Sequence, residues 1–155
     1  MKGLYIGRFD PFHLGHLKAH DLFCKLVDEV KIGIGAQKET DLLSLEERVK
    51  GVCENTGVQP IELEDLDSNH PFYWDWGKYV LRKVEDVEII ATGNNYVKED
   101  FIKNSIPVLW LPRYDNISGT IIRSKINDGD DSWKLLVPEK TKLLVLTSIN
   151  YGRPK

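Results

Sequence analysis

Apolar and polar positions change their spacing along the chain in a way that separates strands from helices. Short apolar runs bounded by glycine or polar residues predict buried strands, whereas apolar residues three and four apart predict helices. The strand-like runs lie at residues 2–6, 29–34, 59–63, 87–92 and 107–111. The helical spacing covers residues 14–27, 44–55, 73–83, 97–104, 118–127 and 138–147. This alternation predicts an α/β fold, a doubly wound parallel sheet of about five strands with helices on both faces.

Local signals and length refine this prediction. Ser44 with Glu47 three residues later predicts a capping box at one helix start, and Pro138 suits the first turn of the last helix. A chain of 155 residues with 41% hydrophobic content predicts one domain over residues 1–155, without repeats or linkers. We expect residues 151–155 to form a frayed tail.

Composition excludes several classes of protein. The net charge of −3 and the absence of a concentrated basic run argue against nucleic acid as a partner, although a small anion needs only a local basic pocket. Cys24 and Cys53 fall on predicted helices among apolar neighbours, which predicts buried free thiols in a reducing compartment. No apolar run approaches the ~18 residues of a membrane span, and the first strand follows Met1 directly, without room for a signal peptide. We therefore expect a soluble cytoplasmic protein with no membrane partner.

The turn after the first predicted strand carries the strongest chemical signal. Residues 7–16 read Gly-Arg-Phe-Asp-Pro-Phe-His-Leu-Gly-His and lead into a helix N-terminus, where unpaired N–H groups and the helix dipole favour an anion. His13 and His16 share one face of the first helical turn, and Gly15 has no Cβ to keep a phosphate away from the backbone. Taken singly, a histidine at a helix start is more often a cap or a packed ring than a catalyst, and glycine and proline beside a strand usually mark only a turn. Their combination predicts a phosphate site.

A second candidate motif opens the helix after the fifth strand. Ser118 is placed to cap this helix, Thr120 offers a hydroxyl near its free N–H groups, and Arg123 returns one turn later on the same side. An ordinary capped helix with a solvated arginine explains the same pattern. A third candidate is Thr92-Gly93-Asn94 at the end of the fourth strand, although asparagine and glycine also make ordinary turns.

Together these motifs resemble the nucleotidyltransferase superfamily with a Rossmann-like core. His-x-Gly-His with Arg8 upstream is similar to the superfamily motif, and residues 7–13 are similar to Gly-Arg-Phe-Gln-Pro-x-His of archaeal-type nicotinamide mononucleotide adenylyltransferases. Residues 117–123 resemble the signature Ile-Ser-x-Thr-x-x-Arg, with Gly119 in place of the commonest serine. The loop at 35–43 is about four residues shorter than the resemblance predicts. Residues 133–138, Trp-Lys-Leu-Leu-Val-Pro, extend the resemblance over nearly the whole chain.

The resemblance implies roles for particular residues. Catalytic residues would be Arg8, His13, His16 and Arg123. ATP would be bound by Gly7, Arg8, Phe9, His13, Gly15, His16, Thr92, Gly93, Asn94, Ile117, Ser118, Thr120 and Arg123. The mononucleotide would be bound by Phe9, Asp10, Arg48, Asp67, Trp76 and Asn94, with Trp76 on the nicotinamide ring and Trp74 as its substitute. For Arg48, a surface ion pair is an equal alternative.

The implied reaction is attack of the nicotinamide mononucleotide 5′-phosphate on the α-phosphorus of ATP, giving NAD and pyrophosphate. It would be assisted by Mg²⁺ held mostly on the triphosphate, without a metal site on the protein. Relatives suggest a homo-oligomer. Three alternatives stay open: a transferase acting on pantetheine phosphate, flavin mononucleotide or a cytidylyl donor; a catalytically silent nucleotide sensor; and, more remotely, a tRNA synthetase fragment. The choice between nicotinamide and nicotinate mononucleotides is not determined.

Overall fold

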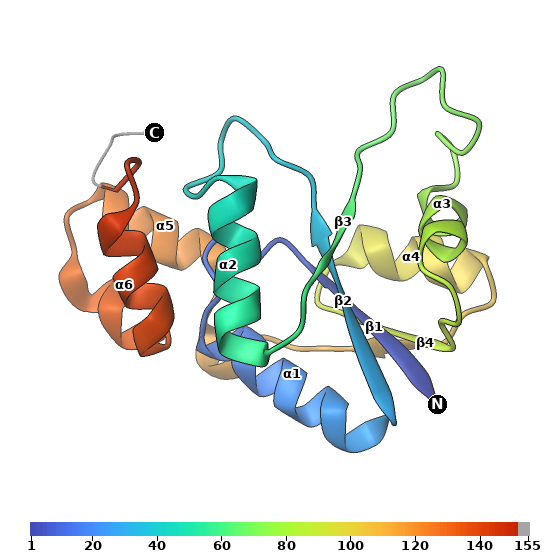
Figure 1. Ribbon diagram of the computed structural model, residues 1–155, viewed down its shortest axis with the longest axis horizontal. Helices are drawn as coiled ribbons and strands as arrows, with labels where there is room; N and C mark the ends of the chain where they lie inside the picture. Colours follow the sequence, from blue (N-terminus) through green and yellow to red (C-terminus); the bar gives the residue numbers. More distant parts are fainter. Residues whose placement is uncertain (152–155) are drawn as a thin grey trace. The chain divides into compact units, whose positions relative to one another are not determined.

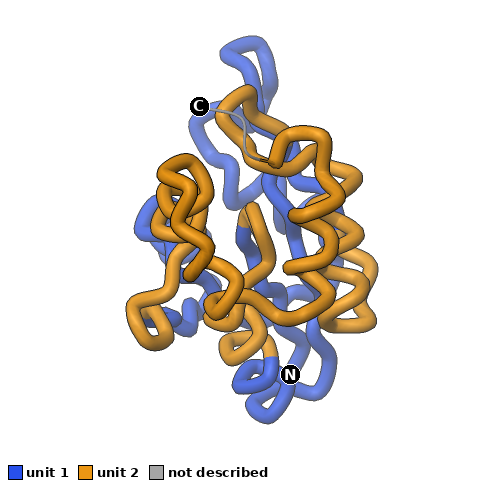
Figure 2. Tube along the Cα trace, turned by 90° about the vertical axis from the view of Figure 1, so that its left-hand side faces the viewer, with its two compact units in different colours: residues 1–7, 21–36, 61–112 blue, residues 8–20, 37–60, 113–155 orange. Residues whose placement is uncertain are grey.

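The computed structural model describes residues 1–151 and divides into two compact units, coloured separately in Figure 2. Unit 1 comprises residues 1–7, 21–36 and 61–112. Unit 2 comprises residues 8–20, 37–60 and the chain from residue 113 on. The chain passes repeatedly from one unit to the other, so neither unit is a continuous segment. The interpretation of residues 1–155 as one domain stays a prediction.

Unit 1 is built on a sheet of five parallel strands (Figure 1). The strands are β1 (Lys2–Gly7), β2 (Glu29–Gly35), β3 (Ile61–Leu63), β4 (Ile89–Thr92) and β5 (Val108–Trp110). Their order is β3-β2-β1-β4-β5, and the register places Leu4 of β1 beside Lys31 of β2 and Ile90 of β4. Strand order reverses between β1 and β4, which is the switch point beyond which ligands bind in doubly wound sheets.

Helices cover both faces of this sheet, as the sequence predicts. On one face, Leu4, Ile6 and Ile90 form a buried cluster with Val80 of α3 (Trp76–Lys83) and Phe101 of α4 (Asn95–Lys103). Figure 1 shows these two helices together beside β4. On the other face lies the second half of α1 (Leu14–Leu26), where Phe23 packs so closely on Gly3 that a Cβ there would lie 2.3 Å from its ring. Alternate residues of β1 therefore face opposite layers.

Unit 2 is helical and holds a core of its own. Its elements are the first half of α1, then α2 (Leu45–Thr56), α5 (Gly119–Asn127) and α6 (Glu139–Thr147), with 3₁₀ turns η1 (Tyr114–Asn116) and η2 (Asp131–Leu136). Its core consists of Leu42, Leu43, Ile117, Ile122, Ile126, Trp133, Val137, Leu144 and Val145. The predicted capping box is confirmed, because the Ser44 hydroxyl accepts the Glu47 N–H at 3.1 Å and the Glu47 carboxylate accepts the Ser44 N–H at 3.0 Å.

Three details differ from the sequence prediction. Helix α3 begins at Trp76 and not at residue 73, because the Asp75 carboxylate accepts the Lys78 N–H at 3.1 Å and caps it there. Neither 3₁₀ turn is predicted from the sequence, since each is too short to show a helical spacing of apolar residues. Strands β3 and β5 are shorter than the apolar runs that predict them.

Further differences concern individual side chains. Cys24 is exposed and Cys53 is half-buried, so the prediction that both thiols are buried is wrong, although within residues 1–151 neither forms a disulfide. Apolar neighbours in sequence do not set which way a helix residue points. Tyr151, expected in a frayed tail, packs against Trp133 with ring centroids 6.0 Å apart. The remaining residues of that tail lie outside the described chain. Within residues 1–151, none of the helices has the length and apolar character required to cross a bilayer.

Candidate active site

The two histidines of the first motif form a single stacked pair at the start of α1. Their ring centroids are 3.5 Å apart and the ring planes differ by 16°. The backbone N–H of His13 donates to Nδ1 of His16 at 3.1 Å, and the backbone N–H of His16 donates to Nδ1 of His13 at 3.2 Å. These reciprocal hydrogen bonds satisfy two of the free N–H groups at the helix start. The spacing seen in the sequence thus produces one rigid unit of two imidazoles.

The hydrogen bonds assign the protonation of both rings. A nitrogen that accepts a backbone N–H carries no proton, so each neutral ring carries its hydrogen on Nε2. Burial, aided by the positive charge of Arg123, lowers the pKa of His13 to about 4. Burial, with His13 as a second cause, lowers the pKa of His16 well below its usual range. The pair is therefore neutral at physiological pH and offers two Nε2–H donors.

Neighbouring residues of the motif hold this pair in place. The buried Phe9 ring lies edge-on to His16 at 4.7 Å, and Phe12 lies 5.4 Å from the same imidazole. Because the Phe9 side chain is buried, the ligand contacts predicted for Phe9 would have to be made by its backbone, which has a φ of 56°. A Cβ at Gly15 would lie 2.9 Å from His13, so this glycine leaves room for the imidazole. The same position is 3.8 Å from the Ile117 carbonyl oxygen, so the first and second motifs meet within unit 2.

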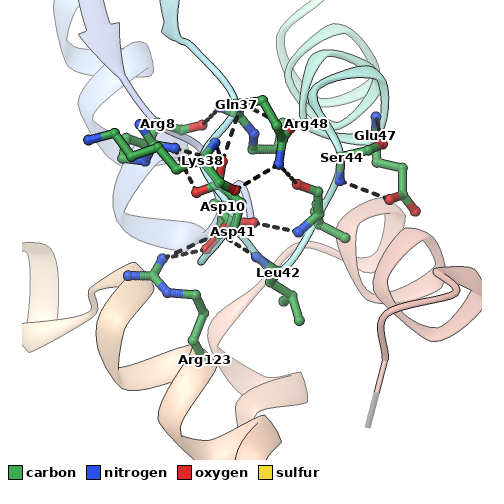
Figure 3. Close-up of polar contacts among 11 residues, drawn as sticks. Arg8, Asp10, Gln37, Lys38, Asp41, Leu42, Ser44, Glu47, Arg48 and Arg123 are labelled. Atoms are coloured by element: carbon green, nitrogen blue, oxygen red, sulfur yellow. Dashed lines mark hydrogen bonds and ion pairs between the residues drawn. The ribbon is translucent and has the colours of Figure 1, made fainter. Parts of the chain in front are cut away.

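The second motif binds back to the first through its arginine. Ser118 caps α5 as predicted, because its hydroxyl accepts the Ile121 N–H at 3.2 Å. Arg123 donates from Nη1 to the backbone carbonyl of Asp10 at 2.7 Å and from Nη2 to the Thr120 hydroxyl at 3.3 Å. The Arg123 side chain is partly exposed, whereas its partner Asp10 is buried. Arg123 is therefore held close to the histidine motif and is not a freely solvated residue (Figure 3).

Asp10 joins the histidine motif to the loop before α2. Its two carboxylate oxygens accept the backbone N–H groups of Leu42 and Leu43, both at 2.8 Å. Its Oδ2 is also 3.8 Å from Nη1 of Arg123. These contacts identify Asp10 as a residue that organises the site. The Asp10 carboxylate, which the resemblance assigns to mononucleotide binding, is thus already engaged by backbone N–H groups of the protein.

Arg8 and Arg48 meet at a carboxylate that sequence reasoning missed. Nη2 of Arg8 donates to both oxygens of Asp41 at 2.6 and 2.7 Å, and Nη2 of Arg48 is 3.6 Å from Asp41 Oδ2. Arg48 also donates from Nη1 to the backbone carbonyl of Arg8 at 3.0 Å. The Arg48 side chain is fully buried, so the alternative of a surface ion pair is excluded. An aspartate in a short loop gives no sequence signal for such a role, since aspartates are common in loops.

The third motif lies in unit 1, at the end of β4, and forms a local cap. The Asn94 side-chain oxygen accepts the N–H groups of Tyr96 and Val97 at 2.8 and 3.2 Å, and the Thr92 hydroxyl accepts the Asn94 N–H at 3.1 Å. A Cβ at Gly93 would lie 3.1 Å from the Leu111 carbonyl oxygen, so this glycine permits close packing of the two strand ends. Gly7 ends β1 of the same sheet, beyond which the histidine motif begins.

Two further residues predicted to bind the mononucleotide, Asp67 and Trp76, also lie in unit 1, whereas Phe9, Asp10 and Arg48 belong to unit 2. Trp76 is half-buried against Phe101 and donates its indole N–H to the Glu64 carbonyl at 2.9 Å. Trp74 is 86% exposed, so it contributes nothing to the core. The Asp67 carboxylate accepts the Asn69 N–H at 2.9 Å in a tight turn. The hydrogen bond and the contact with Phe101 therefore fix the orientation of the Trp76 ring, whereas the Trp74 ring is exposed.

The protein itself offers no metal centre in the part of the chain that the structure describes. Residues 1–151 contain no group of three or more histidine, cysteine, aspartate or glutamate side chains arranged to hold an ion. The buried carboxylates of Asp10 and Asp41 are occupied by backbone N–H groups and guanidinium groups.

The sequence and fold are similar to those of known nucleotide enzymes. Residues 4–125 match the model of the cytidylyltransferase-like family. The nicotinamide-nucleotide adenylyltransferase of Thermococcus onnurineus is 32% identical over 151 residues, covering 89% of this chain and 78% of that protein. The enzyme of the same name from Methanocorpusculum labreanum is 34% identical over 155 residues, covering 93% of this chain and 89% of that protein.

Two solved structures share the fold. A NadR protein in complex with NAD and AMP-PNP has a TM-score of 0.64 at 22% identity, covering 82% of this chain and 42% of that chain. A bifunctional NMN adenylyltransferase/ADP ribose pyrophosphatase from Francisella tularensis, complexed with AMP and a manganese ion, has a TM-score of 0.58 at 20% identity. The match covers 94% of this chain and 52% of that chain. This chain therefore spans about half the length of these two proteins.

The likeness to these two structures agrees with the α/β fold of the five-stranded parallel sheet. The chain belongs to the cytidylyltransferase-like family of nucleotidyltransferases and, within it, to the nicotinamide-nucleotide adenylyltransferases.

Proposed function

We propose that this protein joins nicotinamide mononucleotide to ATP, forming NAD and pyrophosphate. The observation that carries the proposal is the histidine pair at the N-terminus of α1, locked by reciprocal hydrogen bonds and bordered by Arg123. Two neutral imidazoles with Nε2–H groups, a helix N-terminus and a guanidinium group are suited to a triphosphate. The names of the archaeal relatives agree with this substrate pair.

The chemical step is a displacement at the α-phosphorus of ATP. An oxygen of the mononucleotide 5′-phosphate forms a bond to this phosphorus, the bond to the oxygen bridging to the β-phosphate breaks, and pyrophosphate leaves with the electron pair. No protein nucleophile is required. His13 and His16 donate hydrogen bonds to phosphate oxygens as negative charge shifts toward the leaving group. Arg8 and Arg123 add positive charge, worth ~4 kcal/mol at ~4 Å with an effective dielectric of ~20.

Mg²⁺ enters this proposal as part of the substrate. The side chains of unit 2 that carry charge near the histidines are arginines and two occupied carboxylates, which do not make a metal site. We therefore infer that the ion is bound by the triphosphate of ATP. The residues assigned to ATP are then the histidine motif, the start of α5 and the end of β4, and their contacts with the nucleotide are part of the proposal.

For the mononucleotide, Trp76 is the proposed stacking partner of the pyridinium ring. Its indole is fixed by the hydrogen bond to Glu64, and a fixed aromatic ring loses little entropy when a cation binds. Acidic residues of the same segment, Asp65, Asp67 and Asp75, favour the nicotinamide over the negatively charged nicotinate form. Arg48, being fully buried, would act in mononucleotide binding through the residues it holds.

We further propose that the protein works in the cytoplasm as a homo-oligomer, without nucleic acid or membrane partners. Support for self-association comes from the apolar side chains exposed on and after α6, namely Leu143, Leu146 and Ile149. Light scattering of the purified protein at several concentrations measures its mass in solution.

A panel of acceptors tests the proposed reaction. The purified protein is incubated with ATP, Mg²⁺ and, in turn, nicotinamide mononucleotide, nicotinate mononucleotide, phosphopantetheine or flavin mononucleotide, with CTP as the alternative donor. We expect equal amounts of NAD and pyrophosphate with nicotinamide mononucleotide. Pyrophosphate release with only another acceptor would assign the protein to a different transferase. ATP binding without turnover of any acceptor would identify a sensor.

A further inference from the structure

Asp41 is a buried carboxylate on which two arginines of the site converge (Figure 3). It lies in the loop between β2 and α2, and its side chain is 4% exposed. Both of its oxygens lie within hydrogen-bonding distance of Nη2 of Arg8, and Oδ2 also accepts the backbone N–H of Lys38 at 2.8 Å. A carboxylate buried in this way is stable because several donors compensate for the loss of water.

The two arginines differ in exposure, and this difference separates their roles. The Arg8 side chain is 36% exposed, whereas that of Arg48 is 0% exposed. Arg48 donates to the Arg8 carbonyl at 3.0 Å and so holds the backbone from which Arg8 projects. Asp41 holds the other end of Arg8, at the guanidinium. Arg8 is thus fixed at both ends, and it is the member of this cluster that reaches solvent.

We propose that Asp41 is a positioning residue for adenylyl transfer that acts through Arg8. This inference rests on the proposed function. A long arginine side chain loses rotamer freedom when it meets a phosphate, and a partner that orients it beforehand reduces this loss. Asp41 also balances one of the two positive charges, so the cluster of Arg8, Arg48 and Asp41 carries a net charge of +1. With this balance, phosphates in the ground state are not bound too tightly.

Replacing Asp41 with asparagine tests both effects. Asp41→Asn keeps the shape of the side chain but removes its charge, which leaves Arg8 less well oriented in a more positive cluster. We expect kcat to fall at least about tenfold, while the KM for ATP changes less than about twofold or decreases. A purely structural role would instead lower thermal stability without this split between kcat and KM. Asp131→Asn is the matched control, because Asp131 is exposed in the same unit and forms an ion pair with Lys134 at 3.5 Å, away from the arginine cluster.

A double-mutant cycle shows whether Asp41 acts through Arg8. In an Arg8→Ala background, we expect Asp41→Asn to change kcat less than about twofold. An equal loss in both backgrounds, or wild-type kinetics in Asp41→Asn, would overturn the inference. If Asp41→Asn does not fold, Asp41→Glu takes its place in the cycle, since it keeps the charge but shifts the guanidinium.

Pyrophosphate binding by calorimetry separates this inference from the proposed function. If the wild-type protein forms no NAD, the proposed function fails, and pyrophosphate is then the probe for the Asp41–Arg8 pair. We expect Asp41→Asn to bind pyrophosphate at least about threefold more tightly than the wild type, and Arg8→Ala to abolish this gain. Unchanged binding in Asp41→Asn would contradict the charge balance assigned to Asp41.

Discussion

Gly119 provides the space through which Arg123 reaches the first motif. A Cβ at position 119 would lie 2.7 Å from Nη1 of Arg123 and 3.4 Å from the Asp10 carbonyl oxygen that this nitrogen contacts. From the sequence, glycine here is a lost hydroxyl at a position where serine is commonest. In the structure, the missing side chain is what lets the guanidinium lie against Asp10.

Gly119→Ala is therefore expected to move Arg123 with little effect on folding, because the atom displaced is the end of a flexible side chain. We predict a KM for ATP at least about threefold higher and a melting temperature within a few degrees of the wild type. Steady-state kinetics measure the KM, and a thermal melt measures the melting temperature. In an Arg123→Ala background the same substitution should have no further effect, and an additional loss there would disprove the coupling.

Removing either histidine should abolish most of the activity. We predict that His16→Ala, and nearly as strongly His13→Ala, lowers kcat at least ~10²-fold while circular dichroism stays that of the wild type. In the proposed reaction each ring donates one hydrogen bond to phosphate oxygens, and its Nδ1 accepts the backbone N–H of the other histidine, which holds the ring in place. Near-normal turnover of a folded His16→Ala protein would remove the histidine pair from the mechanism.

Arg123→Ala should raise the KM for ATP and lower kcat, since a guanidinium group beside a helix N-terminus contacts phosphates in both the ground state and the transition state. Initial rates over a range of ATP concentrations provide both constants. An arginine that merely forms an exposed ion pair contributes ~0–1 kcal/mol, and kinetic constants within about twofold of the wild type would indicate such a role.

Stability should decrease in mild acid because of His13. Its pKa is about 4 in the folded protein, below the ordinary value of 6.5 that applies to the unfolded chain. Between these values the unfolded chain binds more protons, so the free energy of unfolding falls as pH falls through this window. The loss is on the order of 3 kcal/mol for His13 when complete. Urea denaturation at pH 7, 5.5 and 4.5 measures the free energy of unfolding. In His13→Asn this free energy should decrease less between pH 7 and pH 4.5 than in the wild type. Identical pH dependence in the two proteins would contradict the lowered pKa.

Trp76 and Trp74 can be distinguished by binding. We predict that Trp76→Ala weakens nicotinamide mononucleotide binding by ~1–3 kcal/mol with ATP binding nearly unchanged, and that Trp76→Phe keeps much of the affinity. Trp74→Ala is the matched control and should bind like the wild type, because that ring is 86% exposed and lies edge-on to Tyr73. Since Trp76 also packs on Phe101, titrations are run below the melting temperature of each variant. Equal losses for both ligands would place Trp76 outside the mononucleotide site.

Local chemistry explains which features could be predicted. The capping box of Ser44 and the pairing of His13 with His16 both join residues three apart, so a short stretch of sequence contains all the atoms involved. The start of α3 was misplaced because Asp75 is one of several polar residues in its segment and only the folded chain selects the cap. The exposure of Cys24 was missed for a similar reason, since it depends on what packs against α1.

The alternation of strands and helices, the histidine motif at the start of α1 and the resemblance to adenylyltransferases can all be found from the sequence. The contacts of the folded chain show that Asp41 joins Arg8 to Arg48, that Asp10 holds the loop before α2, and that Gly119 makes room for Arg123 beside Asp10. The physical reason is sequence separation. Periodicity and capping act between residues within one or two turns, whereas Asp41 lies 33 residues from Arg8 and Arg123 lies 113 residues from Asp10. Packing of distant segments brings these residues together, and no local pattern carries information about it.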